Sequence, residues 1–182
     1  PHAGVNAGPA DAAVVTPVRG SARGLALANG LAPGLCDDPY HMVTAAVDER
    51  VRNLVRVGAD PARIAILDNY CWPGCDDPQH LASLVRAAEA CYDGALAYGA
   101  PFVSGKDSLN NEYRVGDETI AIPPTLLISA LAKVQDVGRA TTMDFKEPGN
   151  SIYLVGLTHA ELGGSVHFDL MSSGGSGGVV PA

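Results

Sequence analysis

Two Asp-Pro pairs constrain the fold of this chain more than any other feature of its sequence. Asp38-Pro39 and Asp77-Pro78 each place an N-capping aspartate before a proline suited to the first helical position. Apolar residues then recur at helical spacing, up to Gly58 in the first segment and Gly99 in the second. The pattern predicts two long amphipathic helices. Their expected apolar stripes are Val43, Val47, Val51 and Leu54, and Leu81, Leu84, Val85, Ala88, Cys91 and Tyr92.

Short apolar runs bounded by glycine and proline alternate with these helices and predict strands. The first two, separated by Pro17, Gly20 and Gly24, are expected to form a hairpin or a bent pair, and Gly116-Asp117 is expected to be a turn. We therefore expect an α+β domain whose mixed or antiparallel sheet is packed by two long helices. The runs are Ala12–Val15, Leu25–Ala28, Ile64–Leu67, Phe102–Val103 and Thr125–Leu131.

A domain boundary is expected at Pro148-Gly149-Asn150, because this turn precedes a new apolar run at Ile152–Val155. Residues 1–148 would form the first domain. Residues 149–182 would contribute the first strand and loop of a second, truncated α+β domain, since Ser172–Gly178 offers little that can pack.

Composition excludes several classes of function. The net charge is −8, and the closest basic spacing is Arg50, Arg52 and Arg56 on a single helix, so a nucleic-acid partner is not expected. Neither a run of about twenty apolar residues nor a signal-peptide pattern is present, which predicts a cytoplasmic protein without a membrane partner. The four cysteines lack the two tight pairs of a structural zinc site, and free thiols are expected.

Polar chemistry gathers directly after the predicted strand Phe102–Val103. Gly105 would let a ligand approach the backbone, and Lys106, Asp107 and Ser108 supply a cation, an anion and a hydroxyl group. A loop over residues 104–111 with this mixture suits an anionic substrate with its magnesium ion. The alternative is a polar turn that only joins two strands.

Oxygen donors elsewhere predict a magnesium site. Glu49 and Asn53 are four residues apart and share one helix face, and Asp11 could supply a third oxygen. Glu49 could instead form an ordinary surface pair with Arg52. Asp68 ends an apolar strand, where it could bind a ligand or shape an Asx-turn.

Several motifs occur in an order that resembles the phosphoribosylformylglycinamidine synthase family, also called formylglycinamide ribonucleotide amidotransferase. The resemblance is to the second synthetase half, whose N-terminal domain is of the aminoimidazole-ribonucleotide-synthetase type. The motifs are Gly8-Pro9-Ala10-Asp11-Ala12-Ala13-Val14, Asp38-Pro39-Tyr40, Asp48-Glu49-Arg50-Val51-Arg52-Asn53, Ile66-Leu67-Asp68-Asn69-Tyr70-Cys71-Trp72 and Ser104-Gly105-Lys106-Asp107-Ser108.

The resemblance implies an ATP-dependent ligase of purine biosynthesis. In that reaction phosphorylation activates the amide oxygen of formylglycinamide ribonucleotide, and ammonia from glutamine displaces the phosphate, which gives the amidine, glutamate, ADP and phosphate. It implies ATP or ADP and Mg²⁺ as cofactors. The implied metal ligands are Asp11, Glu49 and Asn53, the nucleotide contacts Ala10, Asp68 and Gly105, and the substrate contact Ser108.

Lys106 departs from the family pattern, because compact members carry an asparagine there as a magnesium ligand. An ammonium group cannot bind magnesium, so either Asp107 takes the metal or Lys106 contacts a phosphate.

The resemblance also implies partners: the remainder of the synthetase and a glutaminase domain or subunit. No catalytic residue is assigned to this part, which is expected to be inactive alone. An uncovered sheet would favour a homodimer of the isolated domain. The alternatives are a half that holds a nucleotide structurally without turnover, and another ATP-using synthetase of the same superfamily.

Overall fold

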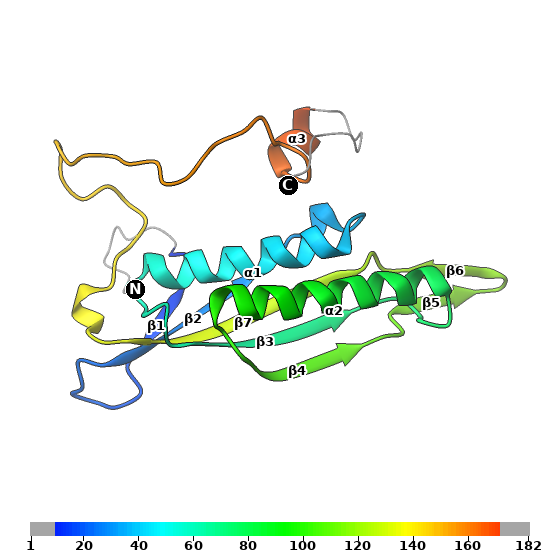
Figure 1. Cartoon of the computed structure of the whole chain (residues 1–182), viewed down its shortest axis with the longest axis horizontal. Helices are drawn as coiled ribbons and strands as arrows, with labels where there is room; N and C mark the ends of the chain where they lie inside the picture. Colours follow the sequence, from blue (N-terminus) through cyan, green and yellow to red (C-terminus); the bar gives the residue numbers. More distant parts are fainter. Residues whose placement is uncertain (1–9, 172–182) are drawn as a thin grey trace.

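The computed structural model describes residues 10–171. Figure 1 shows a sheet with two long helices on one of its faces. The elements are β1 (Ala13–Val15), β2 (Gly24–Gly30), the 3-10 helix η1 (Pro33–Leu35), α1 (Pro39–Arg56), β3 (Ile64–Cys71), α2 (Pro78–Tyr98), β4 (Phe102–Ser108), β5 (Glu112–Val115), β6 (Glu118–Ala121), β7 (Thr125–Val134), the 3-10 helix η2 (Val137–Arg139) and α3 (Val166–Met171).

The main sheet is mixed, with strand order β1-β2-β7-β3-β4. Strands β2 and β3 both pair antiparallel with β7, so they run parallel to each other, and β4 pairs parallel with β3. Helices α1 and α2 are the crossover connections of this parallel set and lie side by side on one face (Figure 1). The predicted α+β class, the mixed sheet and the hairpin of β1 with β2 are confirmed.

Both helices begin as their Asp-Pro pairs predict. Asp38 accepts hydrogen bonds from the backbone N–H groups of Tyr40 and His41, and Asp77 accepts one from Gln79 at 2.7 Å. Helix α2 ends in Gly99, whose φ of 57° is the left-handed conformation that glycine adopts without strain. Local capping therefore fixes where both helices begin and where α2 ends.

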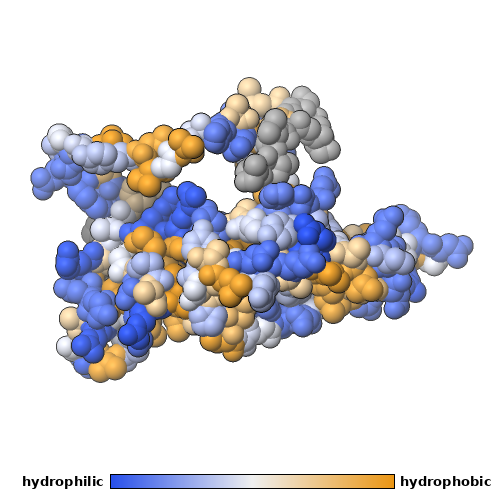
Figure 2. All heavy atoms as spheres, viewed as in Figure 1, coloured by the Kyte–Doolittle hydropathy of each residue, from blue (hydrophilic) through white to orange (hydrophobic). Residues whose placement is uncertain are grey.

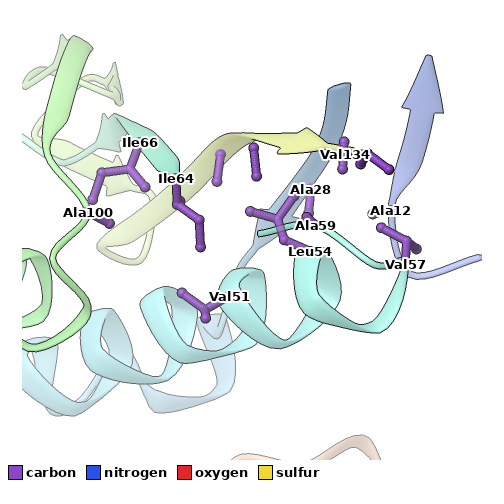
Figure 3. Packing of buried hydrophobic residues seen from close by; sticks show 13 residues of the cluster. Ala12, Ala28, Val51, Leu54, Val57, Ala59, Ile64, Ile66, Ala100 and Val134 are labelled. Atoms are coloured by element: carbon purple, nitrogen blue, oxygen red, sulfur yellow. The ribbon is translucent and has the colours of Figure 1, made fainter. Parts of the chain in front are cut away.

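The predicted stripe of α1 is buried as expected. Val51 and Leu54 pack against Ile64 and Ile66 of β3 in one hydrophobic cluster (Figure 3). Val43 and Val47 belong to a second cluster, which extends to α2. Alternate residues of β2, β3 and β7 supply the facing side chains, as expected for a sheet with one covered face.

The predicted stripe of α2 is wrong in part. Its buried residues are small, and Gly94 lies so close to Val47 that an added Cβ would be 3.0 Å from a Val47 methyl group. Because α1 approaches α2 closely, only the face of α2 with small side chains can be buried against it. Many of the larger apolar side chains of α2 stay exposed. The buried residues are Ala87, Ala90, Cys91 and Gly94; the exposed ones include Leu81, Val85 and Tyr92.

The loop predicted at residues 104–111 is also wrong in part, because residues 104–108 belong to β4. This segment continues the pairing with β3, from Leu67 opposite Ser104 to Cys71 opposite Ser108, after a register shift. Backbone pairing with a neighbouring strand outweighs the low strand propensity of glycine, lysine and aspartate. The turn at Gly116-Asp117 is confirmed between β5 and β6, with a φ of 61° at Gly116.

The strand predicted at Ile152–Val155 is not formed, and these side chains are exposed. Figure 2 shows apolar residues along this part of the chain, which passes over α1. An apolar run becomes a strand only where a neighbouring strand pairs with it, and none lies beside this one in the described part. The predicted loop Ser172–Gly178 lies outside the described residues. The domain boundary near Gly149 stays a prediction.

Within residues 10–171, the longest helices are too polar to cross a lipid bilayer.

Candidate functional site

A row across the middle of the sheet brings together residues that are far apart in the sequence. Ile128 of β7 lies opposite Gly30 of β2 on one side and Asp68 of β3 on the other, and Asp68 lies opposite Gly105 of β4. The row crosses the carboxyl halves of the three parallel strands. Ligands of open α/β sheets bind toward these strand ends, where the following helices begin.

Asp68 and Gly105 form the centre of this row. Oδ1 of Asp68 accepts the backbone N–H of Lys106 at 3.3 Å, and a Cβ added to Gly105 would lie 2.2 Å from the same oxygen. Glycine is therefore required for the carboxylate to lie over the β4 backbone. Burial raises the pKa of Asp68, an effect that the Lys106 N–H opposes. The Asx-turn alternative for Asp68 is not what the structure shows, because the carboxylate contacts a neighbouring strand.

Side chains of β4 divide between the two faces of the sheet. Asp107 lies opposite Tyr70, whose hydroxyl group contacts Cys91 of α2, so Asp107 is on the helix-covered face. Lys106 and Ser108 are on the other face, where the Lys106 ammonium donates to the Ser108 hydroxyl. The cation, the anion and the hydroxyl group were expected to act together in one loop. They instead lie on two faces of the sheet, Asp107 on one and Lys106 with Ser108 on the other.

Glu49 and Asn53 attach α1 to the end of β2. Oε2 of Glu49 accepts the N–H of Leu31 at 2.8 Å, and the Asn53 amide donates to the carbonyl of Asn29 at 3.2 Å. The alternative pair of Glu49 with Arg52 is wrong, since Arg52 pairs with Asp48 at 2.5 Å. Both side chains face the strand end, as a shared ligand would require.

Ala10 and Asp11 precede β1 beside the same strand end. They line a shallow cavity of about 590 Å³ with Asn29, Leu67 and Ser129, on the uncovered side of the sheet. One oxygen of Asp11 pairs with the Arg56 guanidinium at 3.0 Å. The predicted nucleotide contact and one predicted metal ligand therefore border a single cavity.

The four predicted magnesium ligands do not converge. Asp11, Glu49 and Asn53 surround the carboxyl end of β2, and their oxygens are of the type that magnesium binds. Asp107 is on the edge strand β4, three strands away from β2 and so about 14 Å from its end at the usual strand spacing. Residues 10–171 contain no cluster of three or more His, Cys, Asp or Glu side chains suited to a metal. The second oxygens of Asp11 and Glu49 and the amide oxygen of Asn53 take no part in these contacts and are the atoms that a magnesium ion would use.

One contact at this end has no signal in the sequence. Oε2 of Glu112 accepts the N–H of Gly74 at 3.0 Å and so joins the start of β5 to the turn after β3. This hydrogen bond, followed by the pair with Arg114, lowers the pKa of Glu112. The two residues are far apart in the chain, and only the strand pairing brings them together.

Comparisons with known proteins agree with this architecture. The sequence model described as "AIR synthase related protein, N-terminal domain" matches residues 9–133. The chain is 41% identical over 128 residues to phosphoribosylformylglycinamidine synthase subunit PurL of Thermococcus sibiricus, which covers 70% of this chain and 17% of that protein. It is 36% identical over 158 residues to the PurL of Rhodopseudomonas palustris, which covers 86% of this chain and 20% of that protein. The chain thus spans about a fifth of the length of these curated relatives.

Solved structures give the same result. PurLQS of Thermotoga maritima superposes with a TM-score of 0.59 at 28% identity, over 74% of this chain and 21% of that chain. PurL of the same organism complexed with ADP superposes with a TM-score of 0.59 at 29% identity, over 72% of this chain and 21% of that chain. ThiL of Aquifex aeolicus, at 14% identity and a TM-score of 0.51 over 69% of this chain and 36% of that chain, shares the fold.

Proposed function

Because the chain belongs to the AIR synthase related family, through its N-terminal domain, we propose that it is part of a phosphoribosylformylglycinamidine synthase. That enzyme would convert formylglycinamide ribonucleotide, glutamine and ATP to formylglycinamidine ribonucleotide, glutamate, ADP and phosphate. The observation that carries the proposal is the Asp68–Gly105 contact, which lies in the carboxyl halves of two parallel strands, in a fold shared with PurL structures complexed with ADP, ATP and FGAR.

In this proposal Asp68 and Gly105, on the helix-covered face of the sheet, contact the nucleotide, and the cavity beside Ala10, on the uncovered face, is a second ligand surface. The carboxylate of Asp68 would accept hydrogen bonds from the ligand, and Gly105 leaves the β4 backbone open to close approach. Lys106 and Ser108 on the uncovered face would contact phosphate and amide groups.

Asp11, Glu49 and Asn53 would hold Mg²⁺, which neutralises charge on the phosphates during phosphoryl transfer. Asp107 would act separately, since it lies at the other edge of the sheet.

The partners follow from the length of the relatives and from the sheet. The rest of the synthetase, with a glutaminase that supplies ammonia, would complete the enzyme. The face of the sheet opposite α1 and α2 carries partly exposed apolar side chains such as Leu25, Leu67 and Leu127. Another synthetase half or a second copy of this domain would cover that face. A cytoplasmic location and the second domain beginning near residue 149 belong to the same proposal.

A second candidate function is a half that holds a nucleotide without turning it over. Three of the proposed magnesium ligands already have partners within the fold: Arg56 for Asp11, Leu31 for Glu49 and Asn29 for Asn53. These contacts fasten parts of the fold to one another, which is compatible with a half that only holds a nucleotide.

Calorimetric titration of the full 182-residue chain with ADP and Mg²⁺ tests the nucleotide site. We expect binding that Asp68→Asn weakens about tenfold or more through loss of a charged acceptor. Asp117→Asn, at the exposed turn after β5, is the matched control and should bind as the wild type does. Equal affinity in wild type and Asp68→Asn would refute the site.

Turnover separates the two candidate functions. In the complete synthetase, Ser108→Ala should abolish amidine formation while ADP still binds if this part contacts the substrate. Full turnover in Ser108→Ala, together with loss of folding in Glu49→Ala, would instead support the structural half. Unchanged folding and turnover in both variants would contradict both assignments.

A further inference from the structure

Three basic side chains that are scattered in the sequence line one pocket at the far end of the sheet. The pocket has a volume of about 550 Å³, and Arg23, Arg63 and Lys133 are among its lining residues. It lies where the β1–β2 loop, the start of β3 and the end of β7 meet, at the left of Figure 1. Such a concentration is unexpected in a chain whose net charge is −8.

The strand register explains why the three cations meet. Lys133 of β7 pairs with Leu25 of β2, and Ala132 pairs with Ile64 of β3. Arg63, one residue before Ile64, therefore reaches the level of Lys133. Arg23 precedes β2 on the other side of β7. Because the neighbours of Lys133 are buried beneath the helices, Lys133 points to the uncovered face of the sheet.

Within residues 10–171 no carboxylate forms an ion pair with these three cations, although the backbone N–H of Asp60 donates to the Lys133 carbonyl at 3.0 Å. The two nearest acids by sequence are Asp60 and Asp136, and each accepts a backbone N–H in its own turn. Like charges on adjacent strands repel each other, and a bound anion would remove that cost.

The pocket also contains neutral donors. Ser21 and Gln135 line it, and the Ser21 hydroxyl accepts the N–H of Arg23 at 3.0 Å, which orders the loop that carries the arginine. Guanidinium, ammonium, hydroxyl and amide groups around one hollow are the donor set of a phosphate site.

We propose that Arg23, Arg63 and Lys133 form a binding site for a phosphate-bearing anion that is separate from the Asp68 row. Lys133 is five residue steps along β7 from Ile128, so the two sites are about 17 Å apart. The occupant is either free phosphate or pyrophosphate, or the phosphate group of a larger metabolite. The proposal does not depend on which reaction the chain supports.

Calorimetric titration of the full 182-residue chain with pyrophosphate, at low ionic strength and without magnesium, tests this site. Replacing Arg63 and Lys133 together by glutamine should weaken binding about tenfold or more, since each lost cation removes a charge-assisted contact. The matched control is Arg139→Gln, an exposed arginine of η2 outside the pocket, and its affinity should change less than about twofold. Lys106→Gln tests whether the anion occupies the β4 site instead.

Three further readouts complete the test. Urea unfolding of the double variant should show a midpoint no lower than that of the wild type, because a repulsive pair has been removed. Parallel titrations with inorganic phosphate and ribose 5-phosphate distinguish the two sources: tighter binding of the sugar phosphate indicates a metabolite site. Absence of pyrophosphate binding, equal affinity in the double variant, or loss of binding in Lys106→Gln alone would each overturn the proposal.

Discussion

Replacing Arg50 by methionine should stabilise this protein, although it removes a charged residue from a long helix. Arg50 lies on α1 with no exposed surface, between the sheet and α2. Its three guanidinium nitrogens have no hydrogen-bond partner among the described residues. A buried charge normally persists because it is paired, and this one is not. Methionine keeps an unbranched side chain of similar length and removes the charge.

The magnitude follows from the burial. Loss of solvation lowers the pKa of Arg50 from its ordinary value to about 10. This difference corresponds to roughly 3 kcal/mol against the charged form in the folded state. Imperfect packing of the shorter side chain offsets part of the gain, so we expect the free energy of unfolding to rise by about 1 to 3 kcal/mol.

Urea unfolding at neutral pH, followed by circular dichroism, measures this change. Arg52→Met is the matched control, because Arg52 is two residues away on the same helix, is exposed and pairs with Asp48 at the surface. Its stability should change by less than about 1 kcal/mol. The reasoning is refuted if Arg50→Met is less stable than the wild type by more than that amount, because Arg50 would then have a compensating partner.

The pH dependence gives a second check on the same residue. Below pH 10 both the folded and the unfolded wild type carry the proton on Arg50, and the full penalty applies. Above about pH 10 the folded state releases this proton before the unfolded state does, so the stability of the wild type should rise relative to Arg50→Met. Taking the difference between the two proteins removes the contribution of other groups that titrate there.

Three further substitutions test local parts of the fold and the site. Gly30→Ala should lower the urea midpoint strongly, by about 3 kcal/mol or more, because its Cβ would lie 1.9 Å from the Ala46 carbonyl oxygen; an unchanged midpoint would contradict the close approach of α1 to β2. Asp38→Ala should cost about 1 kcal/mol through loss of the helix cap. The hydrogen-bonded imidazole lowers the pKa of the Asp38 carboxyl, so the cost should vanish as the pH falls through that pKa, and a cost independent of pH would argue against the cap. Gly105→Ala should weaken ADP binding about tenfold with little change in thermal midpoint, since the flexible Asp68 side chain can turn away; undiminished binding would exclude close approach at β4.

Local sequence signals predicted the elements that they control directly. The caps at Asp38 and Asp77 and the valine stripe of α1 gave the right helices, because capping and periodicity act within a few residues. Local signals gave a wrong prediction where contact with another helix or strand decides which residues are buried or extended. Gly94 selects the buried face of α2 by contact with α1, and pairing with β3 turns the polar segment after Val103 into a strand.

The candidate site shows the same division. The residue types at Asp68, Gly105 and Ser108 indicated that they could bind a ligand. The sequence did not indicate that Asp68 and Gly105 are partners on neighbouring strands, or that Ser108 lies on the other face of the sheet. The basic pocket gave no signal at all. Arg23, Arg63 and Lys133 belong to no basic run, and strand register alone places them together.

The sequence by itself determined where the two helices begin and which face of α1 is buried. These properties depend on hydrogen bonds and apolar contacts between residues close in the chain. Only the tertiary structure decided the rest: that the residues after Val103 extend an edge strand, that Asp107 and Lys106 point to opposite faces, and that three distant cations share a pocket. The physical reason is the pleat of the sheet, in which the register with a neighbouring strand sets both the face and the neighbours of every side chain.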